Sequence, residues 1–353
     1  MSRSFTRLAF GCFFAQVIVA TQLGCGSVEQ LKIGGTMEIC SVEISKIEPV
    51  QLDMIMLVDQ SGSMAEPISG GTKWSMVAYA SDSFLNDPDS AGIGVALQFF
   101  SLPLPGQTIP TDAMYSCMAG DYATPAVPMG TLPANAARIT GSISQHTPSG
   151  PTPSNTALEG VMTYARAWAA VNSGHRVVVV LATDGEPHGC QDNPTVPSIA
   201  AAGFAATPPI ATYVIGVGSL LTSLNEIARA GGTGQAFVID TSANGTKQFI
   251  DAMYSIRLGQ GLACDYTIPS ADGGEVDLSK VNLDYRPGPD RVKSVPLSSV
   301  SDASQCGIDK LGWYYDNASG ARKIRLCDQT CAQIKRDIHG EMNLSVGCPT
   351  RAN

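Results

Sequence analysis

The sequence predicts an α/β protein with a doubly wound, Rossmann-like parallel sheet flanked by helices, followed by a small cysteine-rich, β-rich C-terminal module. Apolar runs such as 54–58 and 177–183 are short and end abruptly in polar residues, which is typical of buried parallel strands. Segments with apolar residues at helical spacing alternate with these runs, as in a doubly wound fold. From residue 259 onward, turn residues and cysteines separate short strand-like runs.

These changes in composition divide the chain into four segments. Residues 1–24 read as an export signal and residues 25–49 as an N-terminal connecting segment. Residues 50–258 have a length that suits one α/β domain. Residues 259–353 hold five cysteines and form the predicted C-terminal module, because so short a segment builds a small core that disulfides must support.

Within the α/β domain, strands and helices are predicted in alternation. The expected strands are 54–58, 92–100, 177–183, 211–217 and 236–239. The expected helices are 74–85, 132–143, 154–168, 198–206, 224–230 and 246–256. Residues 101–130 are rich in proline and turn residues, so we expect an irregular insertion there, and insertions of that length are often functional or tied down by a disulfide.

A group of oxygen-bearing side chains follows the first predicted strand. Asp59, Ser61 and Ser63 form the pattern D-x-S-x-S directly after residues 54–58. Ligands of open α/β sheets bind outside the carboxyl ends of the strands. One carboxylate and two hydroxyls at that edge are hard oxygen ligands, which suit a small hard cation such as Mg²⁺.

The D-x-S-x-S pattern resembles the metal-ion-dependent adhesion site (MIDAS) of von Willebrand factor type A (vWA) domains. Gly150-Pro-Thr-Pro153 is similar to the G-x-T-P loop of that family, which implies Thr152 as a third hydroxyl. Thr183-Asp-Gly185 is similar to its T-D-G motif, which implies Asp184 as a second carboxylate. The resemblance further implies Mg²⁺ as the metal, with Mn²⁺ or Ca²⁺ as alternatives, and a protein partner whose Glu or Asp carboxylate completes the metal's coordination.

The N-terminus resembles a bacterial lipoprotein signal. Arg3 and Arg7 precede an apolar stretch, 8–20, which is too short to span a bilayer. Leu23-Gly-Cys-Gly26 then resembles a lipoprotein cleavage site with Cys25 as the lipidated residue, although Gln22 departs from the usual apolar residue. We therefore expect an exported, lipid-anchored protein of the cell envelope. Ordinary signal cleavage, which would release a secreted protein, is the alternative.

The chain is acidic, which narrows the classes of partner. Its formal net charge is −9, and removal of the signal, with its two arginines and no acidic residue, makes the charge about −11. Such a charge offers no case for binding nucleic acid or an anionic membrane surface. We expect contact with a membrane only through the lipid anchor.

Eight of the ten cysteines remain after Cys12 leaves with the signal and Cys25 takes the lipid, and in an exported protein an even number favours pairing. Cys117 and Cys190 both lie in loops at the predicted metal-bearing edge, so we expect a disulfide between them. A disulfide between Cys40 and Cys264 would clasp the segments that flank the α/β domain. The other disulfide candidates are Cys306, Cys327, Cys331 and Cys348, and six cysteines allow fifteen connectivities.

The motifs favour binding over catalysis. The sequence holds no H-E-x-x-H, G-x-S-x-G or P-loop motif, and His188 is the nearest candidate base for a serine nucleophile. We therefore expect a protein that is not an enzyme and that binds a protein ligand through its metal. Two alternatives stay open, namely an assembly scaffold with a purely structural metal and a metal-assisted hydrolase.

Overall fold

The computed structural model describes most of the chain from residue 28 onward. The described residues are 28–30, 41–47, 50–190, 194–218, 222–242, 244–259, 262–268, 277–288, 290–307, 311–317, 323–335, 337 and 339–351. The predicted signal, Cys25 and Cys40 lie outside these residues. Within the described part of the chain, no helix is both long and apolar enough to cross a membrane.

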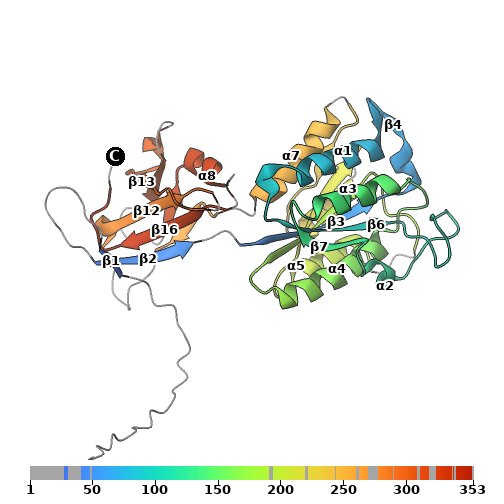
Figure 1. Ribbon diagram of the computed structural model, residues 1–353, viewed down its shortest axis with the longest axis horizontal. Helices are drawn as coiled ribbons and strands as arrows, with labels where there is room; N and C mark the ends of the chain where they lie inside the picture. The colour runs from blue at the N-terminus through green and yellow to red at the C-terminus, as the bar shows by residue number, and fades with distance from the viewer. Residues whose placement is uncertain are drawn as a thin grey trace, which may run out of the picture.

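The first unit is built on a six-stranded sheet with the strand order β10-β9-β8-β3-β6-β7 (Figure 1). All neighbouring strands pair in parallel except β6 and β7, which are antiparallel. The fold class predicted from the sequence is confirmed, with an antiparallel edge strand added to the expected parallel sheet. The strands are β3 (Leu52–Asp59), β6 (Gly94–Phe100), β7 (Val127–Thr131), β8 (Arg176–Thr183), β9 (Ala211–Val217) and β10 (Phe237–Ile239).

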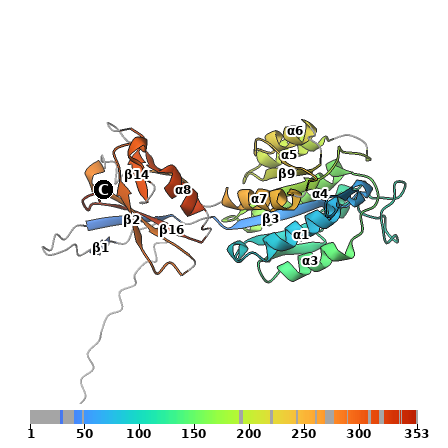
Figure 2. The ribbon, with the colours of Figure 1, turned by 90° about the horizontal axis from the view of Figure 1, so that it is seen from above.

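Helices cover both faces of this sheet (Figure 1), and Figure 2 looks from above onto one of the two helical layers. Because side chains alternate along a strand, Met54, Met56 and Val58 of β3 face one apolar layer while Ile55 and Leu57 face the other. All five side chains are buried. The first layer is covered by α1 (Lys73–Leu85), α3 (Ala136–Gln145) and α7 (Gly245–Leu258), and the second by α2 (Ala119–Tyr122), α4 (Ser154–Val171), α5 (Val196–Phe204) and α6 (Thr222–Ala230).

The segment predicted as an irregular insertion, 101–130, contains two regular elements. It holds the short helix α2 and most of β7, which pairs with β6 across a register irregularity. The helix predicted from residue 132 begins later, at Ala136, because the backbone N–H of Leu132 still donates to Ile93 next to the sheet (2.8 Å). Proline-rich composition therefore concealed an edge strand, the position in a sheet where proline is tolerated.

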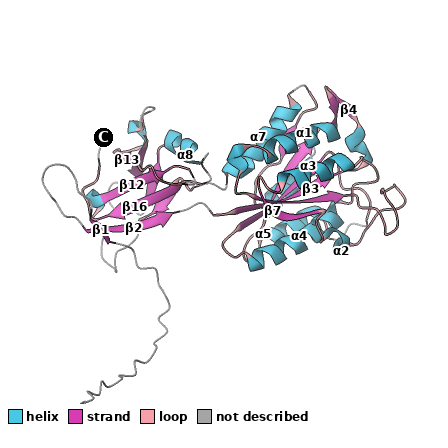
Figure 3. Ribbon diagram, viewed as in Figure 1, coloured by secondary structure: helices cyan, strands magenta, loops and turns pink. Residues whose placement is uncertain are grey.

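The second unit is a sheet with the strand order β1-β2-β16-β12-β13-β14-β15-β11. Figure 3 shows that strands dominate this unit and that α8 packs beside them. The strand-like runs expected in this module at 280–285, 312–315 and 323–326 correspond to β12, β14 and β15. The elements are β1 (Val28–Gln30), β2 (Ser41–Ile47), β11 (Asp265–Thr267), β12 (Val281–Arg286), β13 (Val295–Ser299), β14 (Gly312–Tyr315), β15 (Lys323–Leu326), α8 (Asp328–Lys335) and β16 (Glu341–Val346).

This sheet joins residues from both ends of the chain. β2 comes from the N-terminal connecting segment, in which the sequence suggested an added edge strand over 37–47, and it pairs antiparallel with β16, from Ile47 opposite Met342 to Glu43 opposite Val346. The six-stranded unit is therefore inserted between two parts of one sheet. Trp313 is fully buried in this unit's apolar core, so its ring is not available to stack on a ligand.

Disulfides close the second unit internally. Cys264 is bonded to Cys331 and Cys306 to Cys327. The suggested Cys40–Cys264 clasp is therefore wrong, because α8 follows β15, the strand that pairs with β11, and brings Cys331 to Cys264. The same bonds exclude Cys327 and Cys331 as a pair of metal ligands. Cys348 is also disulfide-bonded.

Gly160 allows α2 and α4 to pack closely. A Cβ at this position would lie 2.2 Å from the carbonyl oxygen of Ala119 and 2.6 Å from the Cβ of Tyr122. We predict that Gly160→Ala lowers the free energy of unfolding by about 1–3 kcal/mol, because a backbone carbonyl must shift to admit the methyl group. Urea unfolding followed by circular dichroism measures the change.

Gly141→Ala in α3 is the matched control. A Cβ on Gly141 would meet no atom within 4 Å. Alanine should therefore stabilise the protein by about 0.5–1 kcal/mol through its better helix propensity. Equal effects of the two substitutions would contradict the packing argument.

Candidate metal centre

Three loops meet at the carboxyl edge of the six-stranded sheet. β3 and β8 are parallel neighbours with Val58 opposite Ala182, so the residues that follow them, from Asp59 and from Thr183, emerge side by side. The loop between α3 and α4 is bonded to the loop after β3 through two backbone hydrogen bonds: Gly62 N–H donates to Gly150 (2.9 Å) and Ser149 N–H donates to Gln60 (2.7 Å). Sheet register and these bonds bring together segments that lie about 120 residues apart in sequence.

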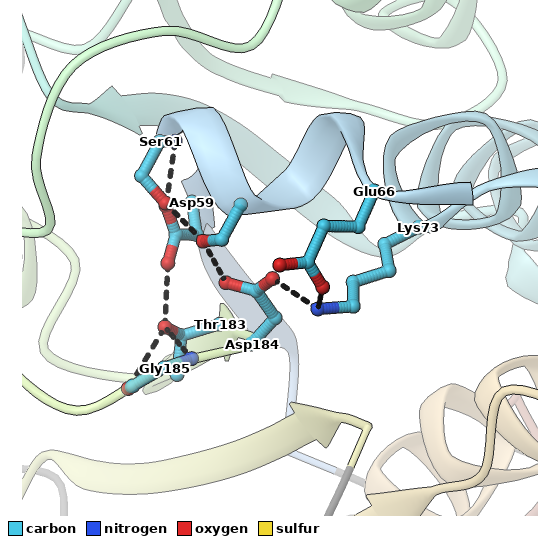
Figure 4. A network of polar contacts seen from close by, with 8 residues as sticks. Asp59, Ser61, Glu66, Lys73, Thr183, Asp184 and Gly185 are labelled. Atoms are coloured by element: carbon cyan, nitrogen blue, oxygen red, sulfur yellow. Dashed lines mark hydrogen bonds and ion pairs between the residues drawn. The ribbon is translucent and has the colours of Figure 1, made fainter. Parts of the chain in front are cut away.

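The D-x-S-x-S loop turns back on its own aspartate. The backbone N–H of Ser61 donates to Asp59 Oδ1 (2.8 Å), and Thr183 Oγ1 donates to Asp59 Oδ2 (2.6 Å). Asp59 is fully buried, and Ser61 and Thr183 are about 1% exposed. The orientation of the Asp59 carboxylate is therefore fixed by the loop that follows β3 and by the last residue of β8 (Figure 4).

The two serines connect this loop to the second carboxylate. Ser61 Oγ lies 3.1 Å from Ser63 Oγ, and Ser63 Oγ donates to Asp184 Oδ1 (2.8 Å). Four of the five residues that the vWA resemblance assigns to the metal, all but Thr152, are thus joined in one network with Thr183.

The backbone of Thr152 is bonded to the loop after Asp184 at the same edge of the sheet. Its N–H donates to the carbonyl of His188 (3.0 Å), whose own N–H donates back to Thr152 (2.9 Å), so the residue is fixed to the loop that follows Asp184. Thr152 is 7% exposed, whereas His188 is exposed. The structure therefore places the third hydroxyl residue in a segment bonded to both of the other loops, and its role toward a metal stays a prediction.

Burial dominates the electrostatics of Asp59. Its removal from water raises the pKa of the carboxyl from its ordinary value of 3.8 to about 6, while the hydrogen bonds from Thr183 and Ser61 lower it and the neighbouring charge of Asp184 raises it further. A carboxylate in this position is costly when ionised and gains strongly from a cation.

The donor set fits a divalent cation. Two oxygens that share an octahedral Mg²⁺, each about 2.0–2.1 Å from the metal, lie roughly 2.9 Å apart. The contacts between Ser61 and Ser63 and between Ser63 and Asp184, at 3.1 and 2.8 Å, are close to that spacing. In the described part of the chain no three His, Cys, Asp or Glu residues gather around one point. A site here must rely on hydroxyl oxygens together with two carboxylates.

Two further charged residues adjoin the site, and the sequence analysis missed both. Lys73 Nζ lies 2.8 Å from Asp184 Oδ2 and 2.5 Å from Glu66 Oε2 (Figure 4). Burial disfavours the ammonium, but its hydrogen bonds to Asp184 and Glu66 outweigh that effect and raise the pKa of Lys73. A lysine at the first position of a helix, where positive charge is disfavoured, was the available signal.

A disulfide fixes the rim of the site. Cys117 and Cys190 are bonded, with an S–S distance of 1.97 Å, as their loop positions suggested. The backbone N–H of Cys190 also donates to Tyr115 Oη (3.2 Å). The bond ties the segment 101–118 to the loop after Asp184, and it excludes a zinc site made from these two thiolates.

No known protein family and no curated protein matches the chain by sequence. Among solved structures, proximal thread matrix protein 1 from the mussel byssus is 17% identical, with 64% of this chain and 51% of that one covered and a TM-score of 0.40. The SpRpn10 VWA domain is 13% identical, with 61% of this chain and 100% of that one covered and a TM-score of 0.40. Manganese-loaded TRAP of Plasmodium vivax is 13% identical, with 82% of this chain and 98% of that one covered and a TM-score of 0.39. This chain thus matches about half the length of the mussel protein.

The raised pKa of Asp59 predicts an unusual dependence of stability on pH. Because the folded pKa lies above the ordinary value, the contribution of this group is greatest below pH 3.8 and is lost as the pH rises through about 6. Without metal, Asp59→Asn should therefore leave stability almost unchanged at pH 4 and raise it by about 3 kcal/mol at pH 7. Thermal unfolding of both proteins in chelator across this range measures the difference.

The other carboxyl groups cancel in that comparison, so only the difference between the two proteins is informative. An asparagine can still accept from the Ser61 N–H, which keeps the loop bonded. A difference that does not change between pH 4 and pH 7 would contradict a raised pKa of Asp59.

Loss of the rim disulfide should loosen the segment 101–118. We predict that Cys117→Ser combined with Cys190→Ser costs about 2–4 kcal/mol of stability, because the bond closes a long loop, with a sequence separation of 73. Limited proteolysis should then cut within this segment. Cys306→Ser with Cys327→Ser, in the second unit, is the control and should leave the segment resistant. Equal cleavage of both double variants would contradict a local role for the bond.

Proposed function

We propose that this chain is an exported cell-envelope protein that binds a protein ligand through a divalent metal ion. One observation carries the proposal: hydroxyl and carboxylate oxygens from two strand ends meet at 2.8–3.1 Å beside a buried carboxylate. The residues proposed to hold the metal are Asp59, Ser61, Ser63, Thr152 and Asp184.

The proposed donors leave the metal attractive to an acidic group. Mg²⁺, or Mn²⁺ or Ca²⁺ in its place, supplies a strongly positive centre with positions left for water or a ligand. Hydroxyl donors such as Ser61 and Ser63 bind it without neutralising its charge. Asp59 is oriented by Thr183 and cannot turn away without losing that hydrogen bond. A Glu or Asp carboxylate of a protein partner is therefore the expected additional ligand.

The rim beside the site favours a protein as the partner. The segment 101–118 packs close to the metal-site loop, because a Cβ on Gly150 would lie 3.0 Å from Pro110. The segment exposes large apolar side chains and is held in place by the Cys117–Cys190 disulfide. Exposed apolar residues that gather beside a polar centre are typical of binding surfaces. These side chains are Leu104, Ile109, Met114 and Met118.

The cell-envelope location rests on the cysteines and on the N-terminal sequence. Disulfides such as Cys117–Cys190 and Cys306–Cys327 form in oxidising compartments outside the cytoplasm. Residues 1–24 have the composition of an export signal, and Cys25 is the proposed site of lipidation. A lipid at Cys25 would be the chain's attachment to a membrane, and cleavage without lipidation would give a secreted form.

A scaffold role without metal-dependent binding has one observation in its favour. The ammonium of Lys73 already neutralises Asp184, so this carboxylate has a counter-ion without a metal. Catalysis has less support, because Ser61 and Ser63 contact each other and Asp184 and the side chain of His188 is exposed. We propose no enzymatic activity.

The test is linked binding of metal and carboxylate. We predict that the protein binds one Mg²⁺ or Mn²⁺ per chain in calorimetry and that a short peptide with a central glutamate tightens this binding. By reciprocity, the metal should tighten binding of the peptide by the same factor, roughly 5-fold or more. A peptide with glutamine in place of the glutamate should have no such effect.

Ser63→Ala should abolish or strongly weaken metal binding, because it removes the oxygen that joins Ser61 to Asp184. Ser83→Ala is the matched control, since this serine lies on the exposed face of α1 and bonds only to its own helix backbone in the described structure. Metal-independent binding of a partner, or the absence of metal binding by the unaltered protein, would favour the scaffold role.

A further inference from the structure

Lys73 stands where the helix itself disfavours a positive charge. It is the first residue of α1, directly after the N-cap Thr72. The N-terminus of a helix carries a partial positive charge, and the capping box formed by Thr72 and Ser75 already satisfies backbone N–H groups there. The stability of α1 therefore does not explain this lysine.

The position of the ammonium is explained by two carboxylates of different accessibility. Nζ lies 2.8 Å from Asp184 Oδ2 and 2.5 Å from Glu66 Oε2. The Lys73 side chain is 12% exposed, that of Asp184 is 0% exposed and that of Glu66 is 60% exposed. Water and salt screen the pair with Glu66, whereas they screen the pair with Asp184 much less.

A short hairpin connects Glu66 to Lys73 and keeps the two residues adjacent. β4 (Pro67–Ile68) and β5 (Gly71–Thr72) pair antiparallel, and the backbone N–H of Lys73 donates to the carbonyl of Glu66 (3.2 Å). Glu66 and Lys73 are therefore kept adjacent by the backbone. Loss of the contact with Asp184 would therefore leave the ammonium paired with Glu66.

Asp184 is shared between this ammonium and the proposed metal donors. Its Oδ1 accepts from Ser63 Oγ, while its Oδ2 accepts from Lys73. A divalent ion bound among Ser61, Ser63 and Asp184 would lie close to the ammonium, and the two positive charges would repel each other across one carboxylate.

We propose that Lys73 is a built-in competitor of the metal ion, with Glu66 as the group that keeps its ammonium when the metal displaces it from Asp184. This inference rests on the proposed metal-dependent function. Without metal, Lys73 neutralises the buried carboxylate of Asp184 and keeps the network intact. Metal binding displaces the ammonium from Asp184 and leaves it paired with Glu66 alone, and the work of that displacement lowers the apparent metal affinity. Lys73 thus sets the metal concentration at which the site becomes able to bind its partner.

The experiment is calorimetric titration of Mg²⁺ and Mn²⁺ into the full chain, three single variants and one double variant. Lys73→Met keeps the length of the side chain and removes its charge. Lys247→Met makes the same change in net charge at an exposed ion pair with Asp251. We expect Lys73→Met to lower the dissociation constant for the metal by roughly 5-fold or more, and Lys247→Met to change it by less than about 2-fold.

The third variant, Glu66→Gln, removes the carboxylate that would keep the ammonium after its displacement from Asp184. It should weaken metal binding when Lys73 is present and have a much smaller effect in the Lys73→Met background. Thermal unfolding is the second readout. In chelator, Lys73→Met should melt below the unaltered protein, because Asp184 is left buried without its counter-ion, and saturating metal should raise its melting temperature by more than that of the unaltered protein.

Each outcome decides the inference. If Lys73→Met binds the metal no more tightly than the unaltered protein does, and Lys247→Met binds it like the unaltered protein, the competitor role is overturned. The proposed metal site is not affected by that result. Absence of binding in both the unaltered protein and Lys73→Met would overturn the proposed metal-dependent function and this inference with it. Binding by Lys73→Met alone would support both, with Lys73 as a complete block.

Discussion

A carboxylate that has no contact with water lies at the end of the central strand, and the geometry of the site depends on it. Asp59 accepts hydrogen bonds from the backbone of Ser61 and from the side chain of Thr183, which compensate only part of the cost of burying its charge. Because Thr183 ends the neighbouring parallel strand, the β3–β8 register must hold for this contact to exist. The sheet therefore holds a carboxyl group whose ionised form is disfavoured by burial, and a nearby cation would stabilise that form.

The second carboxylate has the opposite character. The side chain of Asp184 is as well covered as that of Asp59, yet it has a counter-ion in Lys73, supplied by the first residue of α1. Among the residues that the structure describes, one acid of the site thus lacks a neutralising partner and the other has one. This asymmetry makes both a metal-bound and a metal-free state physically reasonable for the same fold, and it connects the proposed binding function with its regulation.

The second unit shows how far a small core depends on the order of the chain. Its sheet takes β2 from before the six-stranded unit and β16 from near the C-terminus, and two disulfides join elements within it. The runs at β12, β14 and β15 could be predicted from the sequence, because strand propensity between turn clusters is local. The Cys264–Cys331 bond could not, since it depends on how α8 packs after its strand and six cysteines permit fifteen pairings.

The sequence by itself determined most elements of the six-stranded unit and the chemical types at the site. Apolar periodicity defined the buried strands, and polar residues after β3 and β8 marked the edge where Asp59 and Asp184 lie, because both signals are carried by adjacent residues. Only the tertiary structure decided which distant residues meet: the antiparallel course of β7, the pairing of β2 with β16, and the contact of Lys73 with Asp184. Such contacts arise from packing and register between segments far apart in the chain, and local composition carries no record of them.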